Sequence, residues 1–222
     1  MNLQNIQTVA RYEIKYIHRT PIFTGIALIG LLVILFFQYY LQSKEQTFHW
    51  FMITLSSSIP FINTYLFTIL QSILVILAVN EWKGREKHAD TLVTIQAKNI
   101  SNTEYATGKS LGIIVTLLAL NIISLASVMV IHIFDSDSPF QFFPYIFYLF
   151  TLSFPSLLFL LGFSMLATAL VKNRGISMFI LFIFIFISLY HLPTMLHGLL
   201  DFRATCLPNV ISAITGHVGL AN

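Results

Sequence analysis

Residues 21 to 41 read PIFTGIALIGLLVILFFQYYL and contain no charged side chain. A helix of about 20 apolar residues crosses the hydrocarbon core of a bilayer, so this stretch predicts a membrane-spanning helix. The whole chain has the same character: 56% of its residues are hydrophobic, 9% are charged, and 21 of 222 are Phe. Soluble domains carry roughly 25% charged residues. The composition therefore predicts an all-α integral membrane protein.

Four further apolar stretches predict four more spans, at residues 59–80, 110–134, 142–171 and 176–191. Pro155 interrupts the fourth stretch, where we expect a kink. Residues 192–222 contain no further span, and five spans place them on the side of the membrane opposite the N-terminus. We therefore expect one transmembrane domain, residues 1–222, that ends in an extracytoplasmic segment.

The basic residues predict the orientation of the spans. If the N-terminus is cytoplasmic, the three inside segments hold three, five and two Lys or Arg residues, and the outside loops hold Lys44 and Arg203. Basic residues collect on the cytoplasmic side of membrane proteins. This distribution predicts a multi-pass protein of the cell (inner) membrane with its N-terminus in the cytoplasm. Because the net charge of +3 comes from these flanks, it does not predict a nucleic-acid partner.

The N-terminal segment, residues 1–20, predicts an amphipathic helix. Arg11, Lys15 and Arg19 recur every four residues, and Tyr12 and Tyr16 lie on an adjacent face. A helix with this pattern lies in the membrane interface, just before the first span. The alternative is an ordinary basic flank without a helix of its own.

The most highly charged part of the chain, EWKGREKHADTL at residues 81–92, begins the longest predicted cytoplasmic segment, residues 81–109. A flank that only anchors the protein to the membrane needs bases, yet this segment also contains Glu81, Glu86, Asp90 and Glu104. Ser101 and Glu104 have the spacing of a capping box, which predicts a helix start there. The segment is therefore predicted to form a helix, a turn and a second helix that leads into the third span.

Mixed charges give register to a protein contact, and apolar residues give it binding energy. The first helix has both, so we expect it to contact another protein; a simple membrane anchor is the alternative. The candidate contact residues are Glu81, Arg85, Glu86, Asp90, Thr91 and Leu92. The candidate supporting residues are Ser101, Glu104, Gly108 and Lys109.

In their order and spacing, these features resemble the membrane subunit of a type-2 ABC transporter, the ABC-2 permease family. ARYEIKYIHRTPIF resembles the family's interfacial elbow helix. The family has a cytoplasmic coupling segment after its second span. Here the corresponding residues, in order, are Glu81, GREKHADTL, the turn KNISNTEY and Gly108–Lys109. LFTLSFPSLLFLLGFSMLATAL followed by VKNRG is similar to its Pro-containing fourth span and basic turn. The resemblance covers nearly the whole chain.

The resemblance implies a permease, commonly an exporter, that pairs with a second permease subunit (as a homo- or heterodimer) and with cytoplasmic ABC ATPase subunits. Closure of the ATPase dimer would push residues 81–92 and switch the pathway. The family has six spans, so we expect this chain to be a piece of a longer protein. ATGKS at residues 106–110 lacks the upstream glycine of a phosphate-binding loop. We therefore expect no enzyme activity and no cofactor in this chain.

Two other functions stay open: a membrane anchor or assembly module that recruits a soluble partner, and a membrane enzyme that acts on lipid. The seven His residues lack the spacing of a metal site. No acidic or basic residue lies deep in a span, which argues against ion-coupled transport. Polar residues within the spans either line a pathway or form hydrogen bonds between helices. These residues are Gln38, Asn63, Gln71, Asn121 and His132.

Overall fold

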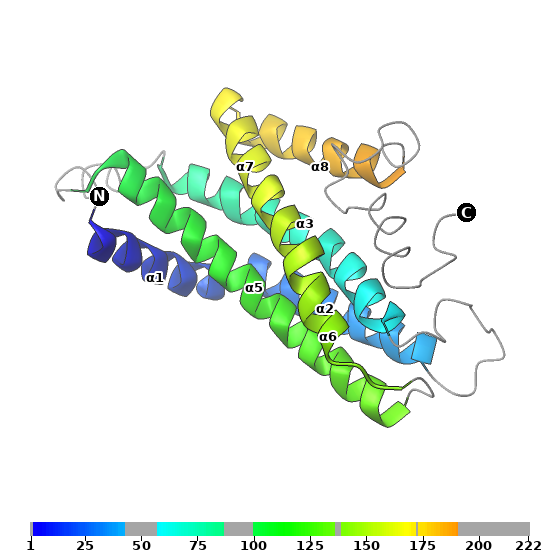
Figure 1. Ribbon diagram of the computed structural model, residues 1–222. Coiled ribbons are helices and arrows are strands. Elements are labelled where there is room, and N and C mark those ends of the chain that lie inside the picture. The colour runs from blue at the N-terminus through cyan, green and yellow to red at the C-terminus, as the bar shows by residue number, and fades with distance from the viewer. Residues whose placement is uncertain (1, 43–56, 87–99, 136–138, 172, 191–222) are drawn as a thin grey trace.

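The computed structural model describes residues 2–42, 57–86, 100–135, 139–171 and 173–190, and every regular element within them is a helix (Figure 1). The all-α prediction is confirmed for this part of the chain. The helices in order are α1 (Leu3–Arg19), α2 (Pro21–Gln42), α3 (Ser58–Glu86), α5 (Asn102–Asp135), α6 (Phe143–Tyr148), the π-helical turn η1 (Leu149–Ser153), α7 (Phe154–Leu170) and α8 (Arg174–Tyr190).

Within the described residues, four segments are long and apolar enough to cross a membrane: residues 21–40, 59–85, 102–134 and 143–170. They correspond to the first four predicted spans. The fifth predicted span is α8, a shorter apolar helix of 17 residues. At about 1.5 Å per residue it is roughly 25 Å long, less than the roughly 30 Å hydrocarbon core. Its crossing of the membrane stays a prediction.

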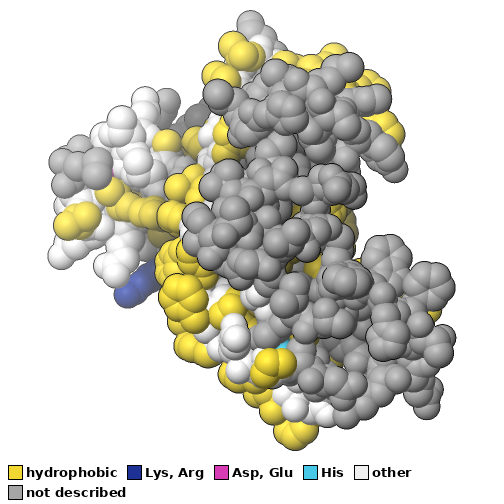
Figure 2. All heavy atoms as spheres, turned by 45° about the vertical axis from the view of Figure 1, so that its right-hand side comes forward, with side chains coloured by type: hydrophobic (Ala, Val, Ile, Leu, Met, Phe, Trp, Pro, Cys, Tyr) yellow, Lys and Arg dark blue, Asp and Glu magenta, His cyan; other side chains and the backbone are white. Residues whose placement is uncertain are grey.

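Helix α3 lies at the centre of the bundle, where it packs against α2, α5, α7 and α8. In its most apolar stretch 67% of the residues are buried, against 22% in α2. The outer helices instead present large apolar side chains at the surface, among them Phe36 on α2 and Phe134 on α5. The described part of the face in Figure 2 is mostly hydrophobic. Such a surface is stable in lipid, where apolar side chains need no protein cover.

A polar layer joins α3, α5 and η1 inside the bundle. The amide of Gln71 donates to the carbonyl oxygen of Ser153 at 3.3 Å, and the Ser153 hydroxyl donates back to Gln71 Oε1 at 3.1 Å. Asn121 Nδ2 donates to the same hydroxyl. Pro155, which has no N–H group to donate within a helix, is the second residue of α7, which follows this π turn. Next to Pro155 the structure thus has a π turn held by side chains from two neighbouring helices, and the expected kink stays a prediction.

Two further interhelical pairs involve the polar residues of the spans. Ser124 Oγ donates to Asn63 Oδ1 at 3.1 Å, and His132 Nδ1 lies 2.8 Å from the Tyr145 hydroxyl. Together with the contacts of Gln71 and Asn121, these pairs favour hydrogen bonding between helices over the lining of a pathway. They hold helices together.

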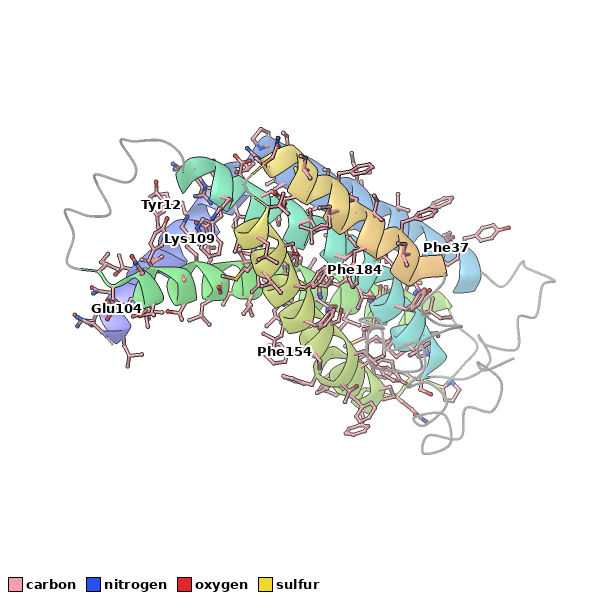
Figure 3. The ribbon with its side chains drawn as sticks, turned by 90° about the horizontal axis from the view of Figure 1, so that it is seen from above. Tyr12, Phe37, Glu104, Lys109, Phe154 and Phe184 are labelled. Carbon is pink, nitrogen blue, oxygen red and sulfur yellow. The ribbon has the colours of Figure 1, made fainter. Side chains whose placement is uncertain are left out.

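Helix α1 lies along the first turns of α5, and the two backbones approach closely at two glycines (Figure 3). A Cβ atom at Gly108 would lie 2.9 Å from the carbonyl oxygen of Ile6, and one at Gly112 would lie 2.9 Å from that of Ala10. Glycines four residues apart allow such close packing of helices in membranes. The predicted role of Gly108 in supporting the segment thus has a structural basis. The position of α1 in the membrane interface stays a prediction.

Substitution of Gly108 or Gly112 by Ala should destabilise the protein. The new methyl group would meet a backbone oxygen that cannot move cheaply, and overpacking of this kind costs about 1–3 kcal/mol. The measurement is the free energy of unfolding in an SDS titration of the protein in mixed micelles. The matched control is Gly162→Ala on α7, where a Cβ would meet nothing within 4 Å. Equal effects at Gly108 and Gly162 would contradict the close approach of α1 and α5.

Candidate functional site

The predicted capping box at the start of α5 is confirmed. The backbone N–H of Glu104 donates to Ser101 Oγ at 3.2 Å, and the backbone N–H of Ser101 donates to Glu104 Oε2 at 3.3 Å. The same carboxylate also accepts hydrogen bonds from the backbone N–H of Asn2 and from the amide of Asn5, at 3.0 Å in the second case. Glu104 therefore fixes the beginning of α1 onto the beginning of α5.

A second carboxylate, Glu13 of α1, is fully buried, and its partners come from α3 and α5. Arg85 of α3 donates a hydrogen bond to its Oε1 atom, and the Nζ atom of Lys109 of α5 lies 3.6 Å from its Oε2 atom. The Arg85 side chain is 17% exposed and that of Lys109 is 5% exposed. We call these three residues the Glu13 cluster. It contributes one charged group from each of three helices.

Aromatic rings cover the two cations of the Glu13 cluster. The guanidinium carbon of Arg85 lies 3.6 Å from the centre of the Tyr16 ring. Lys109 Nζ lies 4.8 Å from the centre of the Tyr105 ring and 5.3 Å from that of Trp82. Cation–π contacts are stronger when they are shielded from water. The rings thus stabilise the cations and keep water from the pairs.

A more exposed ion pair lies beside the Glu13 cluster. Arg174, the first residue of α8, donates to Oε2 of Glu81 on α3, and their side chains are 42% and 35% exposed. The Tyr16 hydroxyl donates to Glu81 Oε1 at 3.4 Å. A Cβ at Gly84 would lie 2.6 Å from the Arg174 guanidinium, so glycine provides the space for this side chain. We call Glu81 and Arg174 the rim pair.

The structure brings together all four predicted supporting residues. Ser101, Glu104, Gly108 and Lys109 all lie where α5 meets α1, and Figure 3 shows Glu104 and Lys109 at this end of α5. Of the predicted contact residues, Glu81 and Arg85 engage other helices of the chain. Glu86 ends α3. Asp90, Thr91 and Leu92 lie outside the described residues.

The predicted N-terminal helix is present as α1, and its buried residues are Ile6, Glu13 and Ile17. Four of the five predicted residues, Arg11, Tyr12, Lys15 and Arg19, are exposed, and Tyr16 is half-buried. Tyr16 faces the two ion pairs instead of serving only as an interfacial anchor.

Glu13 and Arg174 are central to the site, yet the sequence analysis did not select them. Glu13 lies on the buried stripe of α1 between Ile6 and Ile17, seven residues after the first and four before the second. Such spacing places all three on one helix face. The sequence pattern that could have identified Glu13 is an acidic residue on a helix face that is otherwise apolar. Arg174 carried no comparable signal, since a base after a span fits the positive-inside pattern alone.

The described contacts are suited to mechanical linkage. Three ion pairs and the contact between Glu104 and Asn5 connect α1, α3, α5 and α8 at one end of the bundle. Within the described ranges, no three His, Cys, Asp or Glu side chains gather in a way that could hold a metal ion. The arrangement can fix the positions of four helices relative to one another and transmit a displacement of one to the rest.

Replacement of Glu13 by Gln should lower the free energy of unfolding by about 3 kcal/mol, because it leaves the buried Lys109 and the half-buried Arg85 without this anion. The measurement is the same SDS titration, followed by circular dichroism. The matched control is Arg11→Gln on the exposed face of α1. In the double variant Glu13→Gln, Lys109→Gln, the loss should be smaller than the sum of the two single losses, since the pair is removed together. Additive losses would contradict the pairing.

The chain matches none of the known protein families with which it was compared, and no curated protein matches it in sequence.

Proposed function

We propose that this chain is the membrane-spanning permease subunit of an ABC transporter, driven by a separate cytoplasmic ATPase. The observation that carries the proposal is the Glu13 cluster together with the rim pair. Each includes a residue of α3, Arg85 and Glu81, and both residues lie in the last two turns of that helix, directly before residues 87–99. A partner that moved those residues would act on the end of α3, and through it on α1, α5 and α8.

If a movement of α3 is to be passed on to the neighbouring helices, the contacts between α3 and those helices must not rearrange. Rotation of the end of α3 would remove Arg85 from Glu13 and leave a buried carboxylate with weaker compensation, which costs several kcal/mol. The close approach of α1 to α5 at Gly108 and Gly112 limits movement in the same region. These contacts support a role in which α3 and its neighbours move as one body.

The internal contacts divide the charged block into two parts. Glu81 and Arg85 bind other helices of this chain, so we assign them a positioning role. The ATPase contact then falls to Glu86, Asp90, Thr91 and Leu92. In the same proposal α8 is a fifth span, α1 lies in the membrane interface, the N-terminus is cytoplasmic, and a second permease subunit completes the pathway for export.

Substitution of Asp90 and Leu92 by Ala should abolish binding of the ATPase and its stimulated ATP turnover, because both the charge and the apolar anchor of the contact are removed. The measurement is co-purification and ATP hydrolysis with the cytoplasmic ABC ATPase encoded beside this protein. The matched control, Arg11→Ala with Tyr12→Ala, changes exposed residues of α1 and should retain both. Unchanged association of the Asp90 and Leu92 variant would favour a membrane anchor over a permease.

The proposed orientation predicts which sites are accessible from outside the cell. In a Cys206→Ser background, Phe140→Cys should react with a membrane-impermeant maleimide on intact cells, whereas Tyr12→Cys should react only after lysis. Both side chains are exposed, at 41% and 67%, so burial does not explain a difference. Labelling of Tyr12→Cys on intact cells would contradict the cytoplasmic N-terminus.

A further inference from the structure

A cavity of about 310 Å³ lies between α1, α2, α3 and α8, beside the rim pair. Its volume is at the lower end of the range for small-molecule sites, about 300–1,000 Å³. One part of its lining is polar, from Tyr16, Thr20, Glu81, Arg85 and Arg174. The other part is apolar, from Ile17, Ile22, Phe23, Leu77, Ala78 and Met178.

The polar and apolar parts of the lining follow the depth of the membrane. Arg174 is the first residue of α8, and Met178 lies one turn further into that helix. On α3 the order is the same, because Leu77 lies one turn deeper than Glu81. The cavity is thus charged at the level where α8 begins and apolar towards the middle of the bundle. A phospholipid has the same order, with a charged headgroup followed by hydrocarbon.

The charge of the cavity fits an anion. Arg85, Arg174 and Glu81 are among its lining residues, and with the adjacent Lys109 and Glu13 they make three bases and two acids, an excess of one positive charge. Arg85 is held by Glu13, whereas Arg174 is 42% exposed and has five N–H donors to share between Glu81 and a ligand. Arg binds phosphate oxygens in a bidentate manner. Basic pockets between transmembrane helices bind the headgroups of anionic lipids.

We propose that this cavity binds an anionic phospholipid. The phosphate lies at Arg174, and the first methylene groups of an acyl chain lie against Phe23, Leu77 and Met178. The phosphate competes with Glu81 for the Arg174 guanidinium. This site does not depend on an ATPase partner.

The test measures binding of short-chain phosphatidylglycerol to the purified full chain in detergent by native mass spectrometry, with phosphatidylcholine and inorganic phosphate as comparisons. Phosphatidylglycerol should bind more tightly than phosphatidylcholine, and inorganic phosphate should not displace it. Arg174→Gln should weaken the binding of phosphatidylglycerol at least about fivefold, the equivalent of about 1 kcal/mol for one base at the membrane surface. Lys15→Gln, a change of an exposed base on α1, is the matched control.

Glu81→Gln should strengthen phosphatidylglycerol binding, because it removes the carboxylate that competes for Arg174. Loss of the fold cannot produce this gain. Equal binding of the two lipids, displacement by inorganic phosphate, an equal loss in Lys15→Gln, or weaker binding in Glu81→Gln would each overturn the proposal. Displacement by phosphate would identify a site for the free anion instead.

Discussion

The buried carboxylate of Glu13 sets the arrangement of one end of this bundle. A charge removed from water costs several kcal/mol unless partners compensate it. Arg85 and Lys109 supply that compensation from two other helices, so α1, α3 and α5 must meet at one place and in one register. Gly112 makes the meeting possible, since any side chain there would collide with the Cβ atom of Glu13. The buried charge of Glu13 and the absence of a side chain at Gly112 are therefore both needed for this arrangement.

The rest of the interior is held by weaker, neutral contacts. Gln71, Asn121 and Ser153 form a layer around the π turn, and the oxygen of the Asn121 amide has no hydrogen-bond partner there. Interhelical hydrogen bonds of this kind average roughly 0.6 kcal/mol in membranes, and π turns are frequent at functional sites. The two classes of contact give the bundle unequal stiffness. Rearrangement at the end with Glu13 would separate a buried charge from its partners, whereas rearrangement of this polar layer would break only neutral hydrogen bonds.

Features that depend on one segment could be predicted from the sequence, and features that depend on several could not. Apolar length predicts the first four spans, and the spacing of Ser101 and Glu104 predicts the start of α5. The Glu13 cluster depends on how three helices cross, which no local pattern contains. The charge pattern of residues 81–92 therefore predicted an external contact for Arg85, and it gave no sign that the Arg85 guanidinium lies over Tyr16 of the same chain. Glu13 itself could have been identified from α1, because it occupies a position on the buried face of that helix where a hydrophobic residue is normally found.

The two ion pairs differ in how easily a ligand can replace them, and this difference connects the proposed lipid site with the proposed coupling role. Exposed pairs such as Glu81–Arg174 contribute about 0–1 kcal/mol, so a phosphate group can take the place of the carboxylate. The carboxylate of the Arg85–Glu13 pair is fully buried, so this pair cannot be exchanged at comparable cost. An anionic headgroup would therefore loosen α8 from α3 while α1, α3 and α5 stay joined. The lipid would change which helices follow a movement of α3, without altering the residues that a partner touches.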